Sequence, residues 1–211
     1  MRTLIAIPCM ENIPTITVKS LLSLQCEDVE YSFTMNSLVY DARNLLAQKA
    51  CENGFDRILW IDSDMVFEPD LFYRLSAHLD EGYDFVTGLY FSRKMPIIPI
   101  IYKDVKILRK DEKLLPTSVE FADYPKDSFF EVKGCGFGGC MMTTKMVLDI
   151  AQRYGLPFSP ILGFGEDLSF CKRATESGYK IFCDSSIKLG HRSYCVVQEE
   201  DYLKGVGNGK T

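Results

Sequence analysis

The chain has 211 residues, 46% of them hydrophobic and 12% aromatic, which suits one substantial core and is too little for two. Its net charge is -5 and no basic block occurs, so the electrostatic footprint of a nucleic-acid-binding protein is missing. The longest apolar run, residues 95–102, is far shorter than a bilayer span and contains two prolines. We therefore expect one domain with no nucleic-acid partner and no membrane span.

Strands and helices alternate in the first half of the chain. Apolar runs and their punctuation predict strands at residues 3–8, 29–35, 58–61 and 84–90. Helical spacing predicts helices at residues 14–24, 38–53 and 69–79. Ser37 is the predicted N-cap of the second helix, and Pro69 is predicted in the first turn of the third. This alternation predicts an α/β fold with a mainly parallel central sheet, helices on both faces and ligands at the carboxyl ends of the strands.

The second half of the chain is less regular. Residues 97–132 read as short strand-like pieces in surface hairpins and loops. A strand at residues 129–133 leads into a glycine-rich segment, residues 134–139. Helices are predicted at 144–154 and from about 166 to 178, with a last strand at 180–183. We expect residues 1–204 to form the domain and residues 205–211 to be a flexible glycine-rich tail, or a linker if further domains follow.

Cysteine usage points to a reducing compartment. No Cys-x-x-Cys pair is present and the chain has only two histidines, so neither a zinc site nor a disulfide framework is predicted. Free cysteines behave as small buried hydrophobes, which suits a cytoplasmic protein. The eight cysteines are Cys9, Cys26, Cys51, Cys135, Cys140, Cys171, Cys183 and Cys195.

Asp62 and Asp64 directly follow the predicted strand at 58–61. Side chains alternate along a strand, so residues two apart project to the same side and can share a hard cation. The alternative is that they only cap the next helix. Glu68 and Asp70 already stand at the start of that helix, which favours the metal interpretation.

Three later residues are ambiguous when each is taken alone. Glu166 and Asp167 open a predicted helix, where acidic residues are also favoured by the helix dipole. His191 follows an apolar segment and could be a ligand or a hydrogen-bonded structural residue. His78, inside a predicted helix, is assigned the structural role.

Taken in order, these motifs resemble the GT-A glycosyltransferases, especially the family 2-like group. The resemblance covers residues 3–191: the first strand Ile5-Ala6-Ile7-Pro8-Cys9, an Ala42-Arg43-Asn44 helix, Asp62-Ser63-Asp64, the glycine-rich segment, Gly165-Glu166-Asp167 and Gly190-His191. The compact build is also similar to glycosyltransferases encoded by large viruses, chlorella viruses among them. A viral chain would work in the host cytoplasm.

The resemblance implies transfer of a sugar from a nucleotide-diphosphate sugar, with UDP favoured, to a hydroxyl of a glycan or glycoprotein. Asp64 would bind the metal directly, His191 would be a further ligand, and Asp62 would share the cation or hold the ribose. This donor set suits Mn²⁺, with Mg²⁺ as the alternative. Asp167, or else Glu166, would be the general base.

The remaining implied contacts surround this centre. The nucleotide would contact Pro8, Cys9, Glu11, Asn36, Arg43 and Ser63. The sugar or acceptor would contact Arg93, Gly136, Gly138 and Gly139. Arg43 could instead lie on a solvated helix face. The glycines would allow positive φ and close backbone approach to a sugar, or could form only a bulged turn.

Two other functions fit part of the pattern. A haloacid-dehalogenase-like phosphohydrolase also has an Asp-x-Asp after an apolar strand, and Asp62 would then be its nucleophile. That motif normally follows the first strand of the chain, whereas two strands are predicted before it here. A non-catalytic module that binds sugar nucleotides is the other alternative.

Overall fold

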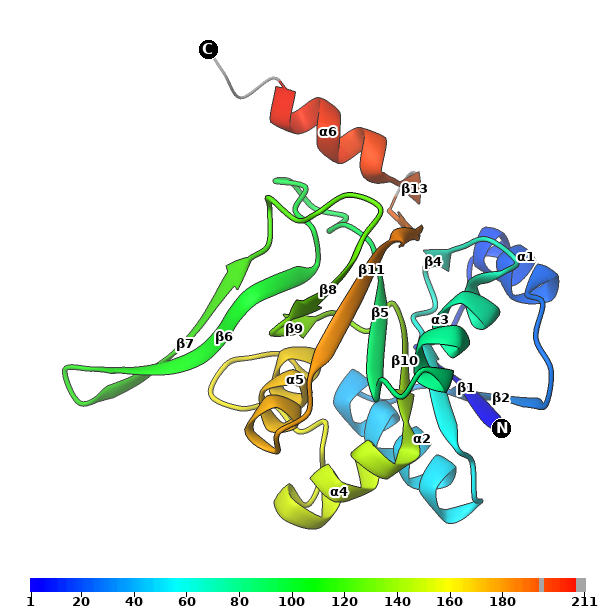
Figure 1. Cartoon of the computed structure of the whole chain (residues 1–211), viewed down its shortest axis with the longest axis horizontal. Coiled ribbons are helices and arrows are strands. Elements are labelled where there is room, and N and C mark those ends of the chain that lie inside the picture. Colours follow the sequence, from blue (N-terminus) through cyan, green and yellow to red (C-terminus); the bar gives the residue numbers. More distant parts are fainter. Residues whose placement is uncertain (194–195, 208–211) are drawn as a thin grey trace.

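The computed structural model describes residues 1–193 and 196–207 (Figure 1). Its helices are α1 Thr15–Ser23, α2 Val39–Glu52, α3 Leu71–Asp80, α4 Thr144–Tyr154, α5 Glu166–Glu176 and α6 Glu199–Gly207. Its strands are β1 Thr3–Pro8, β2 Val29–Thr34, β3 Arg57–Ile61, β4 Met65–Val66, β5 Phe85–Leu89, β6 Ile101–Lys110, β7 Lys113–Glu120, β8 Phe129–Val132, β9 Gly134–Cys135, β10 Gly139–Thr143, β11 Ile181–Lys188, β12 Gly190–Arg192 and β13 Val196–Val197. The predicted elements of the first half are confirmed to within one or two residues at most ends.

A seven-stranded sheet in the order β2-β1-β3-β10-β5-β11-β8 forms the centre of the molecule. The pairs β2/β1, β1/β3 and β5/β11 are parallel, while β10 runs antiparallel to both its neighbours and β8 antiparallel to β11. Five of the seven strands therefore point the same way, which confirms the mainly parallel sheet. The sequence prediction missed β10, because this strand begins inside the glycine-rich segment.

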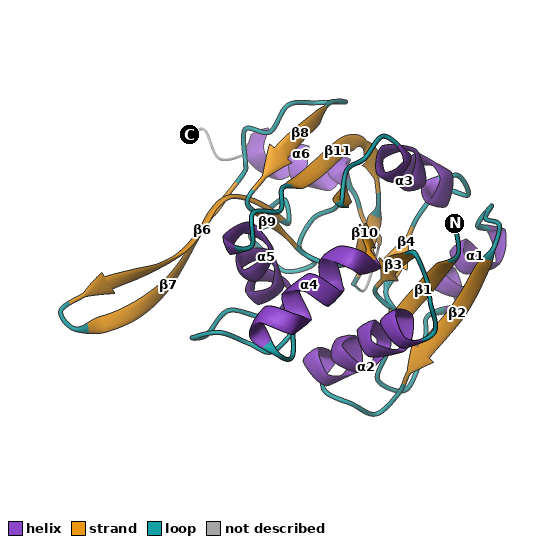
Figure 2. Ribbon diagram, turned by 60° about the horizontal axis from the view of Figure 1, so that its bottom comes forward, coloured by secondary structure: helices purple, strands orange, loops and turns teal. Residues whose placement is uncertain are grey.

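Helices cover both faces of the sheet, as predicted (Figure 2). Alternate strand residues face opposite ways, so Leu4 and Trp60 pack with α2, α4 and α5. Ile5 and Leu59 pack on the other face, in the cluster that contains the apolar residues of α1 and α3. Both faces of β1 and β3 are consequently buried, which fixes the register of the strand that leads into Asp62.

Two predicted helix starts are wrong in detail. Leu38, and not Ser37, is the N-cap of α2, and the Ser37 hydroxyl donates to the Leu38 carbonyl (3.2 Å). Helix α3 begins after Asp70, so Pro69 lies just outside it. Ser37 is thereby free to face the carboxyl end of the sheet.

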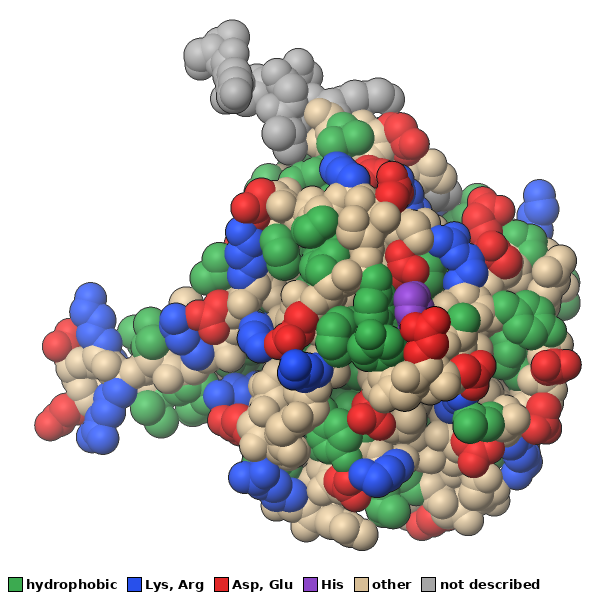
Figure 3. All heavy atoms as spheres, in the orientation of Figure 1, with side chains coloured by type: hydrophobic (Ala, Val, Ile, Leu, Met, Phe, Trp, Pro, Cys, Tyr) green, Lys and Arg blue, Asp and Glu red, His purple; other side chains and the backbone are tan. Residues whose placement is uncertain are grey.

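The β6–β7 hairpin projects from the body of the molecule (Figures 1 and 2). It pairs from Lys110↔Lys113 to Tyr102↔Glu120, so the short pieces predicted at 97–132 are largely one long hairpin. Asp111 and Glu112 both have positive φ (47° and 62°), which is the geometry of a tight hairpin turn. Charged side chains gather toward its tip (Figure 3). These charges masked the strand alternation in the sequence.

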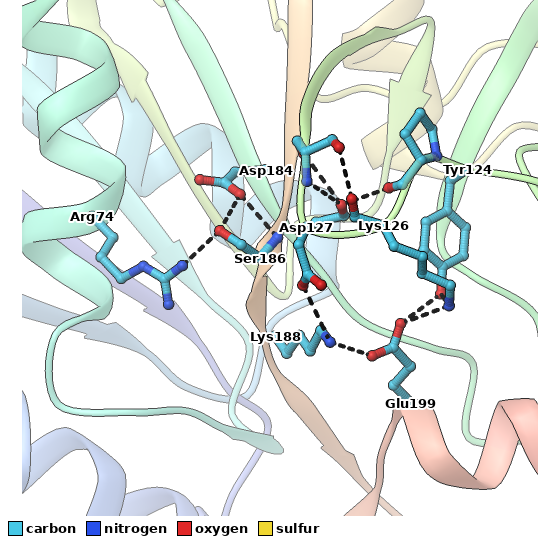
Figure 4. Close-up of polar contacts among 11 residues, drawn as sticks. Arg74, Tyr124, Lys126, Asp127, Asp184, Ser186, Lys188 and Glu199 are labelled. Carbon is cyan, nitrogen blue, oxygen red and sulfur yellow. Dashed lines mark hydrogen bonds and ion pairs between the residues drawn. The ribbon is translucent and has the colours of Figure 1, made fainter.

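The chain beyond residue 183 holds more structure than predicted. β11 extends to Lys188, and β12, β13 and α6 follow. Glu199, at the start of α6, accepts from the Tyr124 hydroxyl and from Lys126 (2.9 Å each) and pairs with Lys188 at 2.5 Å (Figure 4). α6 enters the stretch predicted as a flexible tail, whose last four residues lie outside the described residues.

Two other sequence features have plain structural positions. His78 lies 2.9 Å from Asp184 and stacks on Phe129, in keeping with its predicted structural role. Every cysteine among the described residues is a free thiol, and Cys195 lies outside them. Within the described residues, no helix is both long and apolar enough to cross a membrane.

Candidate active site

Asp62 and Asp64 leave the carboxyl end of β3, where the chain turns sharply. The Asp62 amide donates to the Gly138 carbonyl (3.3 Å), and the Met65 amide donates back to the Asp62 carbonyl (3.2 Å). β4 then pairs antiparallel with β12, which sets Met65 opposite His191. This short pairing brings His191, from the last part of the chain, beside Asp64.

Asp64 and His191 face each other across this junction. His191 Nε2 lies 3.5 Å from Asp64 Oδ2, and Nδ1 lies 2.8 Å from the Phe91 carbonyl. A carbonyl can only accept, so Nδ1 carries a hydrogen and Nε2 is the nitrogen that faces Asp64. Burial lowers the pKa of His191, but the Asp64 carboxylate raises it above its usual value, and only the neutral ring offers a lone pair at Nε2. Burial raises the pKa of Asp64, but the contacts with His191 and Arg93 shift it below its usual value.

Asp62 has a different partner, the guanidinium of Arg43 from α2. Arg43 Nη2 donates to Asp62 Oδ1 (2.7 Å) and Nε donates to Glu166 Oε1 (3.1 Å). The Arg43 side chain is 2% exposed and lies over the rings of Trp60 and Phe137, so the predicted alternative of a solvated helix face is wrong. Arg43 thereby ties the end of β3 to the start of α5.

These side chains open onto one cavity of about 300 Å³. Its walls come from the carboxyl ends of β1 and β3, the start of α2, the segment after β5, the start of α5 and β12. Its lining residues are Pro8, Cys9, Met10, Ser37, Val39, Ala42, Arg43, Asp62, Ser63, Asp64, Arg93, Glu166 and His191. The structure thus brings most of the predicted site residues to one place, at the edge where ligands of parallel sheets bind.

Two predicted nucleotide contacts do not line this cavity. Glu11 and Asn36 are exposed and lie outside it. The backbone N–H of Asn36 donates a hydrogen bond to the Met10 carbonyl (2.9 Å), which links the loops after β2 and β1. Asn36 also has positive φ (53°), a geometry that asparagine tolerates in turns. The structure gives Asn36 a local role in the loop after β2.

The two acidic residues at the start of α5 have different surroundings. Glu166 lines the cavity, whereas Asp167 is half-buried beside it, and Asp167 Oδ1 accepts from the Leu168 amide (2.7 Å). Burial, and then the charge of Glu166, raise the pKa of Asp167 to about 6. A carboxyl with such a pKa can exchange a proton near neutral pH.

The three predicted metal ligands are only partly assembled. No group of three His, Cys, Asp or Glu side chains in residues 1–193 and 196–207 lies close enough to hold a metal. At this site, Asp62 pairs with Arg43. Asp64 and His191 do fit a divalent cation. A metal-bound histidine commonly donates its other ring nitrogen to a backbone carbonyl, as His191 does to Phe91. Two protein ligands with phosphate oxygens suit Mn²⁺ or Mg²⁺.

The glycine-rich segment has a packing role. None of Gly136, Gly138 and Gly139 has positive φ, so that expectation is wrong. A Cβ at Gly136 would lie 2.0 Å from the Tyr90 hydroxyl oxygen, and one at Gly139 would lie 2.2 Å from Leu189 Cδ2. All three glycines are buried and do not line the cavity. They allow close approach of the protein's own side chains.

Four lining residues were missed from sequence: Met10, Ser37, Val39 and Ala42. A usable signal existed for Met10 and Ser37, because each follows the end of a strand at the edge where ligands bind. Ser37 was instead assigned to capping. Val39 and Ala42 follow only from the way α2 is packed.

The chain resembles known proteins in its structure. No protein-family model and no curated protein sequence matches this chain. A197 from STIV superimposes with a TM-score of 0.66 and 24% identity, over 92% of this chain and 86% of its own. GalNAc-T7, in a structure with UDP, GalNAc and Mn²⁺, gives a TM-score of 0.63 and 13% identity, over 98% of this chain and 47% of its own.

These likenesses define the fold class. The chain has the α/β GT-A fold of a glycosyltransferase such as GalNAc-T7, which confirms the fold predicted from the sequence. It spans about half the length of the GalNAc-T7 chain. At such low identity the likeness extends to the fold, and the chemistry of this chain must be argued from its own residues.

Proposed function

We propose that this protein is a metal-dependent glycosyltransferase that moves a sugar from a nucleotide-diphosphate sugar, UDP-sugar favoured, to a hydroxyl of a glycan or glycoprotein. One observation carries the proposal: in a GT-A fold, Asp64 and His191 face each other 3.5 Å apart on a polar cavity at the carboxyl end of β3. The UDP and Mn²⁺ bound to GalNAc-T7, which shares this fold, support the choice of donor and metal.

Asp64 and His191 would hold the cation, Mn²⁺ or Mg²⁺. When bound, the cation would stabilise the negative charge that develops on the leaving diphosphate. Asp62, held by Arg43, would face the ribose, with Ser63 beside it. Pro8 and Cys9, buried at the end of β1, would form the floor under the nucleotide base.

Asp167 is the better candidate for the general base. Glu166 is held by Arg43 through a 3.1 Å charge-assisted hydrogen bond, which restricts its movement. Asp167 lacks that partner and has a pKa near 6, so it can accept a proton from an acceptor hydroxyl at neutral pH. Because Asp167 does not line the cavity but follows Glu166, which does, the acceptor would approach from the α5 side.

We also propose that the protein acts in the cytoplasm, which would be the host cytoplasm if the chain is encoded by a virus. Free cysteines among the described residues accord with it.

Asp167→Asn separates a transferase from a binding module. The variant should bind UDP and Mn²⁺ as the wild type does, while transfer or slow hydrolysis of UDP-sugars falls by about 100-fold or more, because the proton acceptor is removed. Radiolabelled UDP-sugars with Mn²⁺ provide the measurement. Transfer by Asp167→Asn at the wild-type rate would reject Asp167 as the base.

The same assay addresses the two alternatives. A non-catalytic module would bind UDP with Mn²⁺ and release no sugar in either protein. A phosphohydrolase using Asp62 would instead release phosphate from a generic phosphate ester, and Asp62→Asn would abolish that release. Phosphate release without binding of sugar nucleotides would reject the transferase.

A further inference from the structure

Arg93 occupies the position at the candidate site where a cation is needed. Its guanidinium contacts the Asp64 carboxylate, on the same carboxylate oxygen that faces His191. Asp64 is 19% exposed at its side chain, while Arg93 is 49% exposed and lines the cavity. The charge of Asp64 is therefore balanced by a tethered cation that keeps contact with solvent.

The segment that carries Arg93 is a closed loop beside Asp64. It follows β5 and folds back on itself, since the Ser92 amide donates to the Ile98 carbonyl (2.8 Å) and the Ile98 amide donates to the Ser92 hydroxyl (3.0 Å). The residue before Ser92 is Phe91, whose carbonyl orients His191. One short segment therefore positions the imidazole and also supplies the guanidinium.

Arg43, the other arginine of the cavity, has no such freedom. It is 2% exposed, and both of its described hydrogen bonds are to Asp62 and Glu166. Releasing Arg43 would leave two carboxylates facing each other without a counter-charge. Releasing Arg93 costs less by comparison, because its side chain is 49% exposed and water can solvate the freed guanidinium.

We propose that Arg93 is an exchangeable cation: it pairs with Asp64 in the free protein, is displaced when a divalent cation takes Asp64, and then binds the diphosphate that arrives with that cation. The inference rests on the proposed function. Its chemistry follows from the cavity, because a displaced guanidinium on this anchored segment stays at the wall and suits the bidentate oxygens of a phosphate.

The exchange predicts effects of opposite sign on two ligands. In Arg93→Met, Mn²⁺ alone should bind about three- to tenfold more tightly, because it no longer competes with the guanidinium. At saturating Mn²⁺, UDP should bind about tenfold or more weakly, because a phosphate ligand is lost. Electron paramagnetic resonance of free Mn²⁺ measures the first affinity, and calorimetry with UDP measures the second.

Matched variants identify the cause. Lys94→Met removes the neighbouring exposed positive charge and should leave both affinities within about twofold, since its charge is screened by solvent. Arg93→Lys keeps the charge without the fork and should lie between the wild type and Arg93→Met. A loss of both affinities in Arg93→Met would indicate a merely structural role and would overturn the exchange.

Failure of this inference can be told from failure of the proposed function. If wild-type protein binds Mn²⁺ through Asp64, as shown by loss of binding in Asp64→Ala, but Arg93→Met has unchanged Mn²⁺ affinity, only the exchange is rejected. If neither wild type nor Arg93→Met binds Mn²⁺, both the exchange and the metal-dependent function are rejected.

Discussion

Asp62 and Asp64 project from the same turn but have different partners. Asp62 belongs to an ion-pair network with the buried Arg43 and with Glu166, while Asp64 faces His191 and the half-exposed Arg93. The spacing of the two aspartates predicted a shared cation. It could not reveal the division between them, because Arg43 comes from a helix that precedes β3 in the chain and Glu166 lies more than 100 residues away.

Arg43→Met should destabilise the protein strongly. Removing the buried guanidinium leaves the Asp62 and Glu166 carboxylates, which are 31% and 14% exposed, without their shared counter-charge, so we expect a loss of about 1–3 kcal/mol in the free energy of unfolding. Arg2→Met is the control, because its pair with Glu30 is exposed and its loss should lower stability far less. Urea unfolding measures both. Similar losses in the two variants would contradict the role given to Arg43.

Asp167 should make stability depend on pH. Its pKa is raised from 3.8 to about 6 in the folded protein, so the folded state binds more protons between these values and stability falls as pH rises through this range. Asp167→Asn removes the penalty, and we expect it to gain roughly 1–3 kcal/mol relative to wild type between pH 4 and pH 7. Transfer by the wild type should rise with pH through about 6, as the base loses its proton.

Urea unfolding at a series of pH values tests this titration. Asp111→Asn, at the exposed hairpin tip, is the control and should show no such gain. A stability difference between Asp167→Asn and wild type that stays constant from pH 4 to pH 7 would show that Asp167 has an ordinary pKa.

The elements around the site are held by close packing of glycines against Leu189. A Cβ at Gly88 of β5 would lie 2.5 Å from Leu189 Cδ1, and a Cβ at Gly139 of β10 would lie 2.2 Å from Leu189 Cδ2. Leu189 links β11 to β12 and stands two residues before His191. The glycines therefore let the end of β11 approach the sheet closely enough to deliver His191 to Asp64.

Gly139→Ala should move this junction. The added methyl overlaps a buried Leu189, and overpacking of this kind costs about 1–3 kcal/mol in the free energy of unfolding. The double variant Gly139→Ala with Leu189→Ala should lose less stability than the sum of the two single losses, because the shorter side chain removes the overlap. Thermal unfolding of the two single variants and the double variant closes the cycle. Additive losses would mean that the methyl is accommodated elsewhere.

This packing also explains which elements the sequence predicted well. Long apolar runs such as residues 58–61 and amphipathic helices such as α4 carry their signal locally, so their bounds agree with the structure. β10, β12 and the full length of β11 depend on contacts between distant segments. Four glycines in six residues indicated a special backbone, but the causes are side chains distant in the sequence: Tyr90 beside Gly136 and Gly138, and Leu189 beside Gly139.

At the scale of the whole molecule, the order of motifs along the chain predicted the fold better than it predicted the site. The alternation of strands and helices and the position of Asp62 after the third strand are confirmed by the GT-A fold. The cavity also gathers most of the predicted residues. Glu11, Asn36 and the glycines do not line it, because nearness in sequence to a strand end does not determine which way a side chain or loop faces.

The most direct test of the account is the thermal stability of the protein with UDP, with and without Mn²⁺. If Asp64 and His191 hold a cation that binds the diphosphate, UDP at about 100 times its Kd should raise Tm by roughly 5–10 °C with Mn²⁺ present. UDP with a chelator should have little effect, and Asp64→Ala should show no Mn²⁺-dependent rise. Equal stabilisation in the chelator, or the same behaviour in wild type and Asp64→Ala, would contradict the account.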